Sequence, residues 1–408
     1  MTLLPNQWKS DRLKDRVRFS YGESLAAGDR VDGHVKVFGS NGEVGSHDRA
    51  ITDAPVIVIG RKGSFGKVTW ADRPCFPIDT TYFVDRKQTH ENLRWLYYAL
   101  VDLQLDTVNC DSAVPGLSRE AAYSLAVAYP PRPEQERIAA YLDASCASID
   151  AAVAAKRQQI DTLDQICGSL VEGAVTRGIN VRATCAPIDR DWIGSLPEHW
   201  EAIRIKRVVS RVDYGISVST EREGKHPVLK MGNVQAGEIV FSKMEFVDEV
   251  ADELLLDNND LLYNRTNSSD QVGKAALFRG SKDDGVTFAS YLVRLRANHR
   301  VVPSFLNYVV NCGGFLTFAR KLAIPSVQQS NLNSTRYCRL LIPLPPLREQ
   351  HAICEHLDSR LAELKGVVAT IEHQIETLTA YRKSLIHEYV TGQRRVPEAD
   401  VKRAEAYG

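Results

Sequence analysis

The chain contains the same segment twice. Residues 131–135, Pro-Arg-Pro-Glu-Gln, return 215 positions later as Pro-Leu-Arg-Glu-Gln at 346–350. The same spacing holds without a gap over roughly 45 residues, which chance would rarely give. It relates the identical pairs Ile138/Ile353, Leu142/Leu357, Asp143/Asp358, Val153/Val368, Gln159/Gln374, Ile160/Ile375, Thr162/Thr377, Leu163/Leu378, Ser169/Ser384, Leu170/Leu385, Val175/Val390 and Thr176/Thr391. The repeat therefore predicts that the chain folds as two structurally related halves.

The openings of the two halves also match, but at a different spacing. Residues 4–8, Leu-Pro-Asn-Gln-Trp, correspond to residues 196–200, Leu-Pro-Glu-His-Trp, at an offset of 192. The change of offset means that the segments between the opening and the closing match have diverged in length. Two matching ends around a divergent middle indicate a shared frame that carries two different specificities.

Composition places the chain among ordinary soluble proteins with several domains. Its 408 residues suffice for two or more cores, and 44% of them are hydrophobic and 25% charged. We expect no stretch apolar enough to cross a bilayer and no signal peptide. The eight cysteines are scattered singly, without the spacing of a zinc site, so reduced thiols in a cytoplasmic protein are expected.

The formal net charge is zero, from 51 basic and 51 acidic residues. A protein that binds nucleic acid by charge alone usually has a basic domain, so this balance counts mildly against that mode of binding. It leaves open a protein whose positive charge is local.

Apolar and small residues follow a heptad pattern after each proline run. The first stripe, whose one interruption is a lysine, consists of Ile138, Leu142, Ser145, Ile149, Ala152, Lys156, Ile160, Leu163, Cys167, Leu170 and Ala174. The second consists of Ile353, Leu357, Leu361, Leu364, Val368, Ile371, Ile375, Leu378, Leu385 and Tyr389. Proline followed by Glu-Gln suits a helix start, and Gly178 and Gly392 suit the helix ends.

We predict two long helices that pair antiparallel, each roughly 65 Å long at 1.5 Å per residue. The predicted pairing places four residues of the first helix against four of the second, namely Leu142, Ile149, Ile160 and Leu163 against Leu357, Leu364, Ile375 and Leu378. The alternative is that each helix packs only on its own domain.

The divergent middles have short β-branched runs and one helical segment each. Strand-like runs include residues 56–59, 67–70 and 82–84 in the first half and 260–263, 275–278 and 291–295 in the second. Helices are expected at 92–103 and near 304–310. We predict two similar α+β domains on mixed or antiparallel sheets, at 1–132 and 181–345. The long helices at 133–180 and 346–393 join them in a pseudo-two-fold duplication, and residues 394–408 form a tail.

A polar, basic, glycine-containing loop follows a strand in each half. The first loop spans residues 60–67 and the second spans residues 264–274, and both begin around an arginine and end in Gly-Lys. Arginine can grip guanine, asparagine or glutamine can grip adenine, and lysine or hydroxyl groups can hold phosphates. An ordinary solvated loop is the alternative.

Two earlier loops, around residues 36–42 and 229–233, are further candidates. The candidate DNA-binding residues of all four loops are Lys36, Ser40, Asn41, Arg61, Lys62, Ser64, Lys67, Lys230, Asn233, Asn264, Arg265, Thr266, Asn267, Ser268, Gln271 and Lys274.

The chain resembles the specificity (S) subunit of type I restriction–modification systems over nearly its whole length. The resemblance is carried by the proline runs 130–135 and 343–350, the opening 192–200 and the segments 114–117, 260–263, 272–275 and 328–333. It implies two target-recognition domains that read the two halves of a bipartite DNA site. It also implies that the long helices set the spacing between these halves.

The resemblance further implies two methyltransferase (M) subunits and restriction/translocase (R) subunits as partners. These would carry out adenine methylation and restriction and would hold S-adenosylmethionine, ATP and Mg²⁺, so no cofactor or metal is expected on this chain. In agreement, the sequence has no Asn/Asp-Pro-Pro-Tyr/Phe motif, no glycine-rich S-adenosylmethionine loop and no phosphate-binding GxxxxGK[ST] loop.

Three other interpretations remain open. One is an S-like subunit of another modification or defence system. Another is a coiled-coil scaffold without DNA contacts. The third is a divergent nuclease or methyltransferase, for which the available carboxylates are Asp79, Asp248, Glu249, Asp252 and Glu253.

Overall fold

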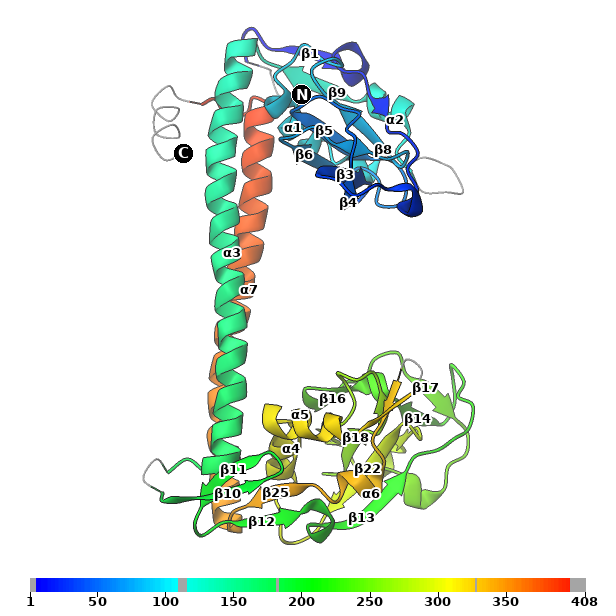
Figure 1. Cartoon of the computed structure of the whole chain (residues 1–408), viewed down its shortest axis with the longest axis vertical. Helices are drawn as coiled ribbons and strands as arrows, with labels where there is room; N and C mark the ends of the chain where they lie inside the picture. Colours follow the sequence, from blue (N-terminus) through cyan, green and yellow to red (C-terminus); the bar gives the residue numbers. More distant parts are fainter. Residues whose placement is uncertain (1–4, 109–115, 181–182, 327–328, 397–408) are drawn as a thin grey trace. The chain divides into compact units, whose positions relative to one another are not determined.

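The computed structural model describes residues 5–108, 116–180, 183–326 and 329–396. The chain forms two compact units (Figure 1). Unit 1 comprises residues 1–157 and 371–408, and unit 2 comprises residues 158–370. Each unit therefore combines one of the predicted α+β domains with parts of both long helices.

The two predicted long helices are α3 (Arg132–Arg177) and α7 (Leu347–Val390). Both begin directly after the proline runs. Both are followed by a glycine in the left-handed region, Gly178 at φ +74° and Gly392 at φ +76°. A residue with a side chain rarely adopts this conformation, which is why glycine ends both helices.

Unit 1 contains a four-stranded antiparallel sheet covered by α1 (Leu93–Asp102). Its strands are β1 (Lys9–Arg12), β2 (Ser20–Tyr21), β3 (Val35–Gly39), β4 (Gly42–His47), β5 (Val56–Gly60), β6 (Val68–Ala71), β7 (Phe76–Pro77), β8 (Thr81–Val84) and β9 (Ala126–Tyr129). The other helices are η1 (Leu13–Asp15), η2 (Ala27–Asp29), η3 (Leu105–Thr107) and α2 (Arg119–Ser124). The sheets have the orders β2-β8-β5-β6, β4-β3-β7 and β1-β9.

Unit 2 has a mixed six-stranded sheet of order β13-β22-β18-β20-β16-β15. Its strands are β10 (Cys185–Arg190), β11 (Ile193–Pro197), β12 (Glu201–Arg204), β13 (Val209–Tyr214), β14 (His226–Leu229), β15 (Val234–Gln235), β16 (Gly237–Ile239), β17 (Glu245–Val247), β18 (Leu261–Asn264), β19 (Thr266–Asn267), β20 (Ala275–Leu277), β21 (Thr287–Phe288), β22 (Leu292–Ala297), β23 (Ile324–Ser326), β24 (Gln329–Asn331) and β25 (Leu341–Leu344).

The short helices of unit 2 are η4 (Ile205–Arg207), η5 (Met231–Asn233), η6 (Asp252–Leu254), η7 (Lys282–Asp284), α4 (Pro303–Asn311), α5 (Gly313–Lys321) and α6 (Ser334–Tyr337). Three further sheets have the orders β17-β14-β21, β19-β24-β23 and β10-β11, and β12 pairs with β25. The pair β12–β25 corresponds to β1–β9 of unit 1 by both repeat offsets. The predicted α+β class with mixed or antiparallel sheets is therefore confirmed.

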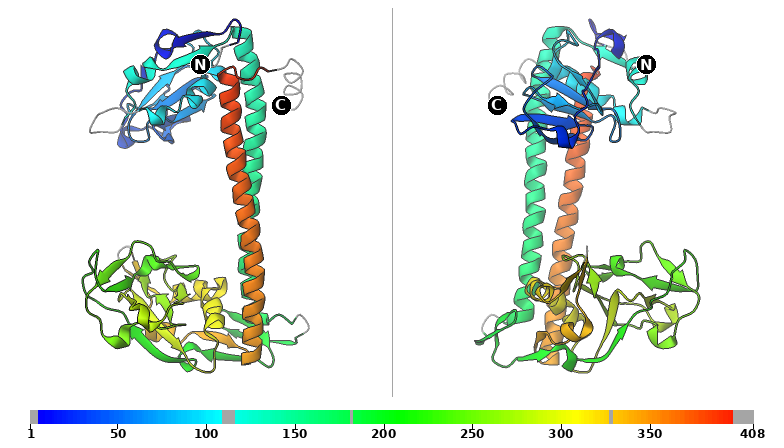
Figure 2. Two further views of the ribbon diagram at one scale, coloured as in Figure 1. Left: turned by 180° about the vertical axis from the view of Figure 1, so that it is seen from behind. Right: turned by 45° about the vertical axis from the view of Figure 1, so that its right-hand side comes forward.

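The long helices pair antiparallel within unit 1, and they lie side by side there in both views of Figure 2. The rings of Tyr141 and Tyr389 are 4.7 Å apart, and Arg382 Nε lies 3.0 Å from Asp150 Oδ1. Further along, Lys156 Nζ donates to Gln374 Oε1 over 2.5 Å. Because the residue numbers on α7 fall as those on α3 rise, the two helices run in opposite directions.

Burial along the predicted helix stripe depends on a third packing partner. Leu142 and Ile149 are buried in the core of unit 1, and Leu357 is buried in the core of unit 2. The other five residues of the predicted pairing set are only half-buried, namely Ile160, Leu163, Leu364, Ile375 and Leu378. Apart from Ile371, which is buried at 8% exposure, the described stripe residues are buried only where the α+β domain packs against the helices, because two helices enclose a side chain less completely than three layers do.

A carboxylate at the start of each long helix connects that helix to the opening of a domain. Glu134 Oε2 accepts a hydrogen bond from Trp8 Nε1 over 3.1 Å, and Glu349 Oε2 accepts one from Trp200 Nε1 over 3.0 Å. The other oxygen of Glu134 accepts from Arg395 Nε over 2.9 Å. These contacts explain why glutamate and tryptophan both recur in the repeat.

The glutamine that follows this glutamate connects each long helix to the start of a helix in the adjoining domain. Gln135 Oε1 accepts from the backbone N–H of Asn92 over 2.8 Å, and Gln350 Oε1 accepts from that of Val302 over 2.7 Å. Asn92 and Val302 are the residues before α1 and α4. The recurring Glu-Gln pair therefore positions the domain on its long helix, in addition to suiting a helix start.

One stretch of α3 is more apolar than we expected. It contains an 18-residue window with a mean hydropathy of 1.3, long and apolar enough to cross a membrane by composition. The expectation that no such stretch exists is therefore wrong. However, Ile138 and Leu142 of this helix lie in the core of unit 1, and Asp143 accepts hydrogen bonds from Arg94 and Tyr98. These residues of α3 serve domain packing.

The Glu134 contact gives a stability prediction. Glu134→Ala leaves the indole of Trp8 and the guanidinium of Arg395 without their acceptor. We expect the free energy of unfolding of unit 1 to fall by about 1.5–3 kcal/mol, as measured by urea denaturation. The matched control is Glu136→Ala, because Glu136 on the same helix is 57% exposed and pairs with the exposed Arg132. Equal losses in the two variants would contradict the assigned role.

Candidate nucleic-acid interface

In unit 1 an arginine of the predicted loop lies on an exposed tyrosine. The guanidinium of Arg61 is 4.9 Å from the ring centroid of Tyr21, which is 47% exposed. Arg61 Nη1 donates to the carbonyl of Asp79 over 3.0 Å, which fixes the side chain from its other end. A second guanidinium, that of Arg119 at the start of α2, lies 5.1 Å from the same ring. We call Tyr21, Arg61 and Arg119 the Arg–Tyr site of unit 1.

Unit 2 has the corresponding arrangement. The guanidinium of Arg265 is 5.1 Å from the ring centroid of Tyr214, which is 43% exposed. Arg265 Nη1 donates to the carbonyl of Ser290 over 3.1 Å. Here the first residue of α6 is Ser334, whose hydroxyl lies 2.7 Å from the hydroxyl of Tyr214. Tyr214, Arg265 and Ser334 form the Arg–Tyr site of unit 2.

The two loops share one backbone frame. The amide of Gly60 donates to Lys67 O over 2.9 Å, and the amide of Asn264 donates to Lys274 O over 2.8 Å. The return bonds, Gly66 to Gly60 and Gly273 to Asn264, are both 2.8 Å long. Gly66 and Gly273 have φ of +79° and +87°, which explains why both loops end in Gly-Lys. The frame is therefore constant, while the side chains between its ends differ.

Around the Arg–Tyr site of unit 1, several predicted residues come together. Lys62 and Ser64 are exposed. Lys67 Nζ donates to the carbonyl of Asn41 over 2.7 Å, which connects the loop to the turn between β3 and β4. Ser40 Oγ donates to Thr80 O over 2.7 Å. By contrast, Lys36 pairs with Glu43 within the β3–β4 hairpin.

The remaining predicted residues of the second loop are held by short-range hydrogen bonds. Thr266 Oγ1 accepts from Asn331 Nδ2 over 3.0 Å, and Asn267 Oδ1 accepts from the amide of Ser268 over 2.8 Å. Lys274 Nζ donates to Gln271 Oε1 over 2.8 Å. Gln271 Nε2 also donates to Asp270 Oδ2 over 2.5 Å, so both ends of the Gln271 amide are engaged within the loop.

Asn264 differs from its neighbours, because it is only 1% exposed and its side-chain amide has no partner among the residues that the structure describes. Its counterpart in unit 1 is Gly60, whose Cβ would lie 2.5 Å from Ser64 O. Unit 1 therefore has no room for a side chain at this position, and the two loops differ inside as well as on their surfaces.

Lys230 and Asn233 have structural contacts. Asn233 is 4% exposed, and its Nδ2 donates to Val240 O over 2.8 Å while its Oδ1 accepts from the amide of Lys230 over 2.8 Å. Lys230 Nζ pairs with Glu245. The amide of Asn233 is fully used in shaping this turn, so the interface proposed below does not include either residue.

The carboxylates that an enzyme would need are solvated or paired. Asp248, Glu249, Asp252 and Glu253 are all exposed, and Asp252 forms an ion pair with Lys282. Asp79 contributes its backbone carbonyl to Arg61. These contacts are those of surface residues.

A buried ionic network fixes the strand that ends in Tyr214. Arg294 is fully buried, with Nη2 2.6 Å from Asp213 Oδ2, and Asp213 immediately precedes Tyr214. Asp260 is also fully buried and accepts from Arg296 Nε over 2.7 Å. Burial opposes ionisation of Asp213, but the hydrogen bonds from Arg294 and Arg211 outweigh it and lower its pKa.

Unit 1 uses apolar packing at the same position. Asp213 faces Arg294 across the β13–β22 pair, while Ser20 faces Phe83 across the β2–β8 pair. Asp213 immediately precedes Tyr214, and Ser20 immediately precedes Tyr21. The strand pair beside the Arg–Tyr site therefore contains a buried ion pair in unit 2 and a buried aromatic ring in unit 1.

Residues 5–162 match the family model of the type I restriction modification DNA specificity domain. The matched segment comprises the first α+β domain and part of α3. It is 27% identical over 205 residues to the putative type I restriction enzyme MjaX specificity subunit of Methanocaldococcus jannaschii, covering 49% of this chain and 47% of that protein. It is 23% identical over 258 residues to the type I restriction enzyme EcoKI specificity subunit of Escherichia coli K12, covering 62% of this chain and 53% of that protein.

The matched segments span about half the length of these two relatives. A solved structure concerned with complex assembly and conformational transition of the type I R-M system contains a chain of similar fold. It has a TM-score of 0.70 and 14% identity, and the match covers 97% of this chain and all of that one. The fold shared with that chain therefore extends beyond the residues that the family model matches.

Sequence analysis missed Tyr21, Tyr214, Arg119 and Ser334. One signal could have found the tyrosines, because they are related by an offset of 193, close to that of the two openings. The contacts of Arg119 and Ser334 join positions far apart in the chain, which local patterns do not reveal.

The lowered pKa of Asp213 gives a prediction of pH dependence. Because the pKa is lower in the folded state, the stabilisation is complete above about pH 3.9, the ordinary pKa of aspartate, and is lost as pH falls through the folded pKa. At pH 7, Asp213→Asn should lower the free energy of unfolding of unit 2 by about 1–3 kcal/mol. Its difference from the unchanged protein should shrink under acid conditions.

The matched control for this experiment is Asp248→Asn, because Asp248 is exposed in the same unit. We expect it to change stability by less than about 0.5 kcal/mol at every pH. A constant difference between Asp213→Asn and the unchanged protein from pH 7 to pH 3 would show that the charge of Asp213 is unimportant.

Proposed function

We propose that this chain is the DNA-recognition subunit of a type I restriction–modification complex. Its substrate would be double-stranded DNA with a bipartite target, of which each unit reads one half. The observation that carries the proposal is the pair of Arg–Tyr sites, which have the same frame and different surrounding side chains. A protein that reads two unlike half-sites requires this combination of a constant frame and variable contacts.

The geometry of the arginines suits base recognition. In each unit, stacking on tyrosine and one hydrogen bond to a carbonyl hold the guanidinium in place. This leaves further N–H groups of the planar fork for the O6 and N7 atoms of guanine. Because the side chain is already ordered, less conformational entropy is lost when DNA binds.

The side chains around the arginines predict different half-sites. Unit 1 offers a second guanidinium from Arg119 and the exposed Lys62, whereas unit 2 offers the amide of Asn267. Arginine favours guanine, and asparagine or glutamine favours adenine. We therefore infer that the half-site of unit 2 contains an adenine read by a side-chain amide.

The proposal assigns no catalysis and no cofactor to this chain. Adenine methylation and restriction would belong to two methyltransferase subunits and to restriction/translocase subunits, which would hold S-adenosylmethionine, ATP and Mg²⁺. The duplicated frame supports two copies of the methyltransferase, since two equivalent junctions offer two equivalent docking surfaces. The complex would act in the cytoplasm, where the DNA is.

Paired substitutions test whether each unit reads its own half-site. Arg61→Ala with Lys62→Ala should relax recognition of one half-site, and Arg265→Ala with Asn267→Ala should relax recognition of the other. Removal of each bidentate base contact should cost about 1–3 kcal/mol of discrimination. The measurement is competition by duplexes with one altered half-site, using the chain assembled with its methyltransferase partner.

A matched control exists in unit 1, where Arg86 and Lys87 are an exposed Arg-Lys pair outside the loop. Arg86→Ala with Lys87→Ala should leave half-site preference unchanged. If the loop variants alter only the salt dependence of binding, Arg61 and Arg265 hold phosphates, and the proposed base contacts are wrong.

The tyrosines allow a separate test of preorganisation. Tyr21→Phe and Tyr214→Phe keep the ring under the arginine, whereas Tyr21→Ala and Tyr214→Ala remove it. Loss of the ring should cost about 0.5–2 kcal/mol of binding to the cognate half-site, and the phenylalanine variants should lose less. Equal losses for alanine and phenylalanine would show that the hydroxyl group matters and that stacking does not.

A further inference from the structure

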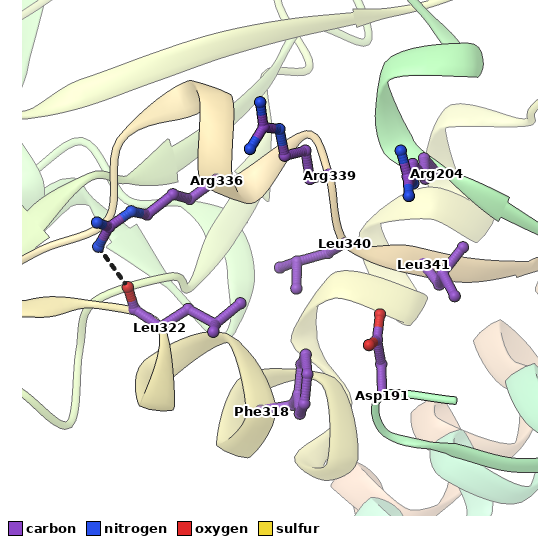
Figure 3. A pocket seen from close by; sticks show the side chains of 8 residues that line it. All are labelled: Asp191, Arg204, Phe318, Leu322, Arg336, Arg339, Leu340 and Leu341. Carbon is purple, nitrogen blue, oxygen red and sulfur yellow. Dashed lines mark hydrogen bonds between the residues drawn. The ribbon is translucent and has the colours of Figure 1, made fainter. Parts of the chain in front are cut away.

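Unit 2 carries an open cavity with a basic lining (Figure 3). It has a volume of about 610 Å³ and lies where α5, α6, β12 and β25 meet. Arg204, Arg336 and Arg339 line it, together with Asp191. The register of the β12–β25 pair brings these arginines together. Arg204 on β12 is paired with Leu341 on β25, and Leu341 follows the end of α6 by four residues.

Two more cations extend this surface. Lys206 and Arg207 of η4 line a neighbouring depression that shares Arg204 and Leu341 with the first. The backbone amide of Lys206 donates to Cys338 O over 2.9 Å, so η4 is fixed beside Arg339. We call Arg204, Lys206, Arg207, Arg336 and Arg339 the basic surface of unit 2. All five are exposed.

The positive charge of the basic surface is poorly compensated. Arg336 Nη1 donates to the carbonyl of Leu322, which is neutral, and the five cations form no ion pair among the residues that the structure describes. Of the nearby carboxylates, Glu201 pairs with Arg300, and Asp191 is left to face three arginines. With three arginines against one aspartate, the concave site has a net positive charge and would concentrate anionic ligands.

The fold itself does not require these cations. Unit 1 has the same β1–β9 frame, and the repeat offsets place Asp15 at the position of Arg207, Ala121 at that of Arg336 and Ser124 at that of Arg339. Only Arg12 and Lys14 repeat the positive charge of Arg204 and Lys206. Three of the five cations are therefore particular to unit 2.

The basic surface adjoins the Arg–Tyr site of unit 2. Arg336 follows Ser334 by two residues in α6, and the hydroxyl of Ser334 lies 2.7 Å from that of Tyr214, the ring that carries Arg265. The four residues of α6 span only about 6 Å at 1.5 Å per residue. Side chains two residues apart on a helix point in different directions, but a DNA duplex is wider than this one-turn helix, so a duplex seated on the Arg–Tyr site would also extend to Arg336.

We propose that the basic surface binds backbone phosphates of the duplex that unit 2 reads. This inference rests on the proposed function and extends it. The second half of the chain would hold DNA independently of sequence, to a degree that the first half does not. A chain of zero net charge would in this way obtain a local site of phosphate attraction.

The test is the salt dependence of DNA binding by the chain assembled with its methyltransferase partner. Arg336→Ala with Arg339→Ala, alone and combined with Arg204→Ala, Lys206→Ala and Arg207→Ala, are compared with the unchanged complex. The slope of log affinity against log salt should become shallower by about 0.9 for each phosphate that the protein no longer neutralises. Discrimination between cognate and altered half-sites should not change.

Two further variants serve as controls. Arg336→Lys with Arg339→Lys keeps the charge and should keep the slope. Arg360→Ala with Lys365→Ala removes exposed cations of unit 2 that are already paired with Glu363 and Glu238, so the slope should stay the same. The Arg336/Arg339 double variants change only two exposed side chains, so they remain informative if the variant with all five substitutions does not fold.

The outcomes distinguish this inference from the proposed function. If the unchanged complex shows no preference for any target sequence, the proposed function fails. If it shows a preference but the alanine variants keep the full salt slope, the phosphate assignment is overturned. If those variants instead lose the methyltransferase subunits on gel filtration, the basic surface docks a protein, and the inference is equally overturned.

Discussion

The hydrogen bond between a helix-start glutamate and a domain-opening tryptophan is the contact on which the rest of this structure depends. Glu134 receives Trp8 in unit 1, and Glu349 receives Trp200 in unit 2. The ring of each tryptophan also packs on the glycine that ends the other long helix, Trp8 on Gly392 and Trp200 on Gly178. A helix start, a helix end and a domain opening thus meet at one point. Because the contacts between the domain and its long helices are concentrated at this junction, the sequence between the junctions is free to diverge.

The frame was predictable from sequence because its signals are periodic or repeated. The heptad stripes gave the long helices to within a few residues, and the repeat gave their equivalence. The stripe could not show that Ile160, Leu163 and Leu364 would be only half-buried, because burial depends on a third layer. Arg61 and Arg265 were found from local composition, but Tyr21 and Tyr214 were not, because each arginine meets its tyrosine across a distant strand. Asn233 has the residue type of a base-reading side chain, yet its amide is used inside a turn.

The strand position next to the tyrosine of the Arg–Tyr site is stabilised by different interactions in the two units. Beside Tyr214, the buried Arg294 is held by Asp213 and by backbone carbonyls, whereas beside Tyr21 the partner is Phe83. A buried ion pair contributes little net stability over apolar packing, but it penalises every arrangement in which one charge is left alone. It therefore fixes the end of β13, and with it Tyr214, more strictly than apolar contact would. The position of Tyr21 depends instead on the two guanidinium groups above it.

The distribution of charged residues gives the zero net charge of the chain a physical consequence. A uniformly basic protein would bind all DNA well, and its specificity would suffer, since specificity is a difference between affinities. In this chain acidic residues balance the basic ones overall, and the five cations of the basic surface, which form no ion pair among the described residues, lie next to the proposed base-reading site. If the proposed function holds, phosphate attraction would act mainly when the duplex is already placed for reading. Because the basic surface is fully developed only in unit 2, the proposed phosphate attraction would belong mainly to that half of the chain, and unit 1 would depend more on the contacts of its Arg–Tyr site.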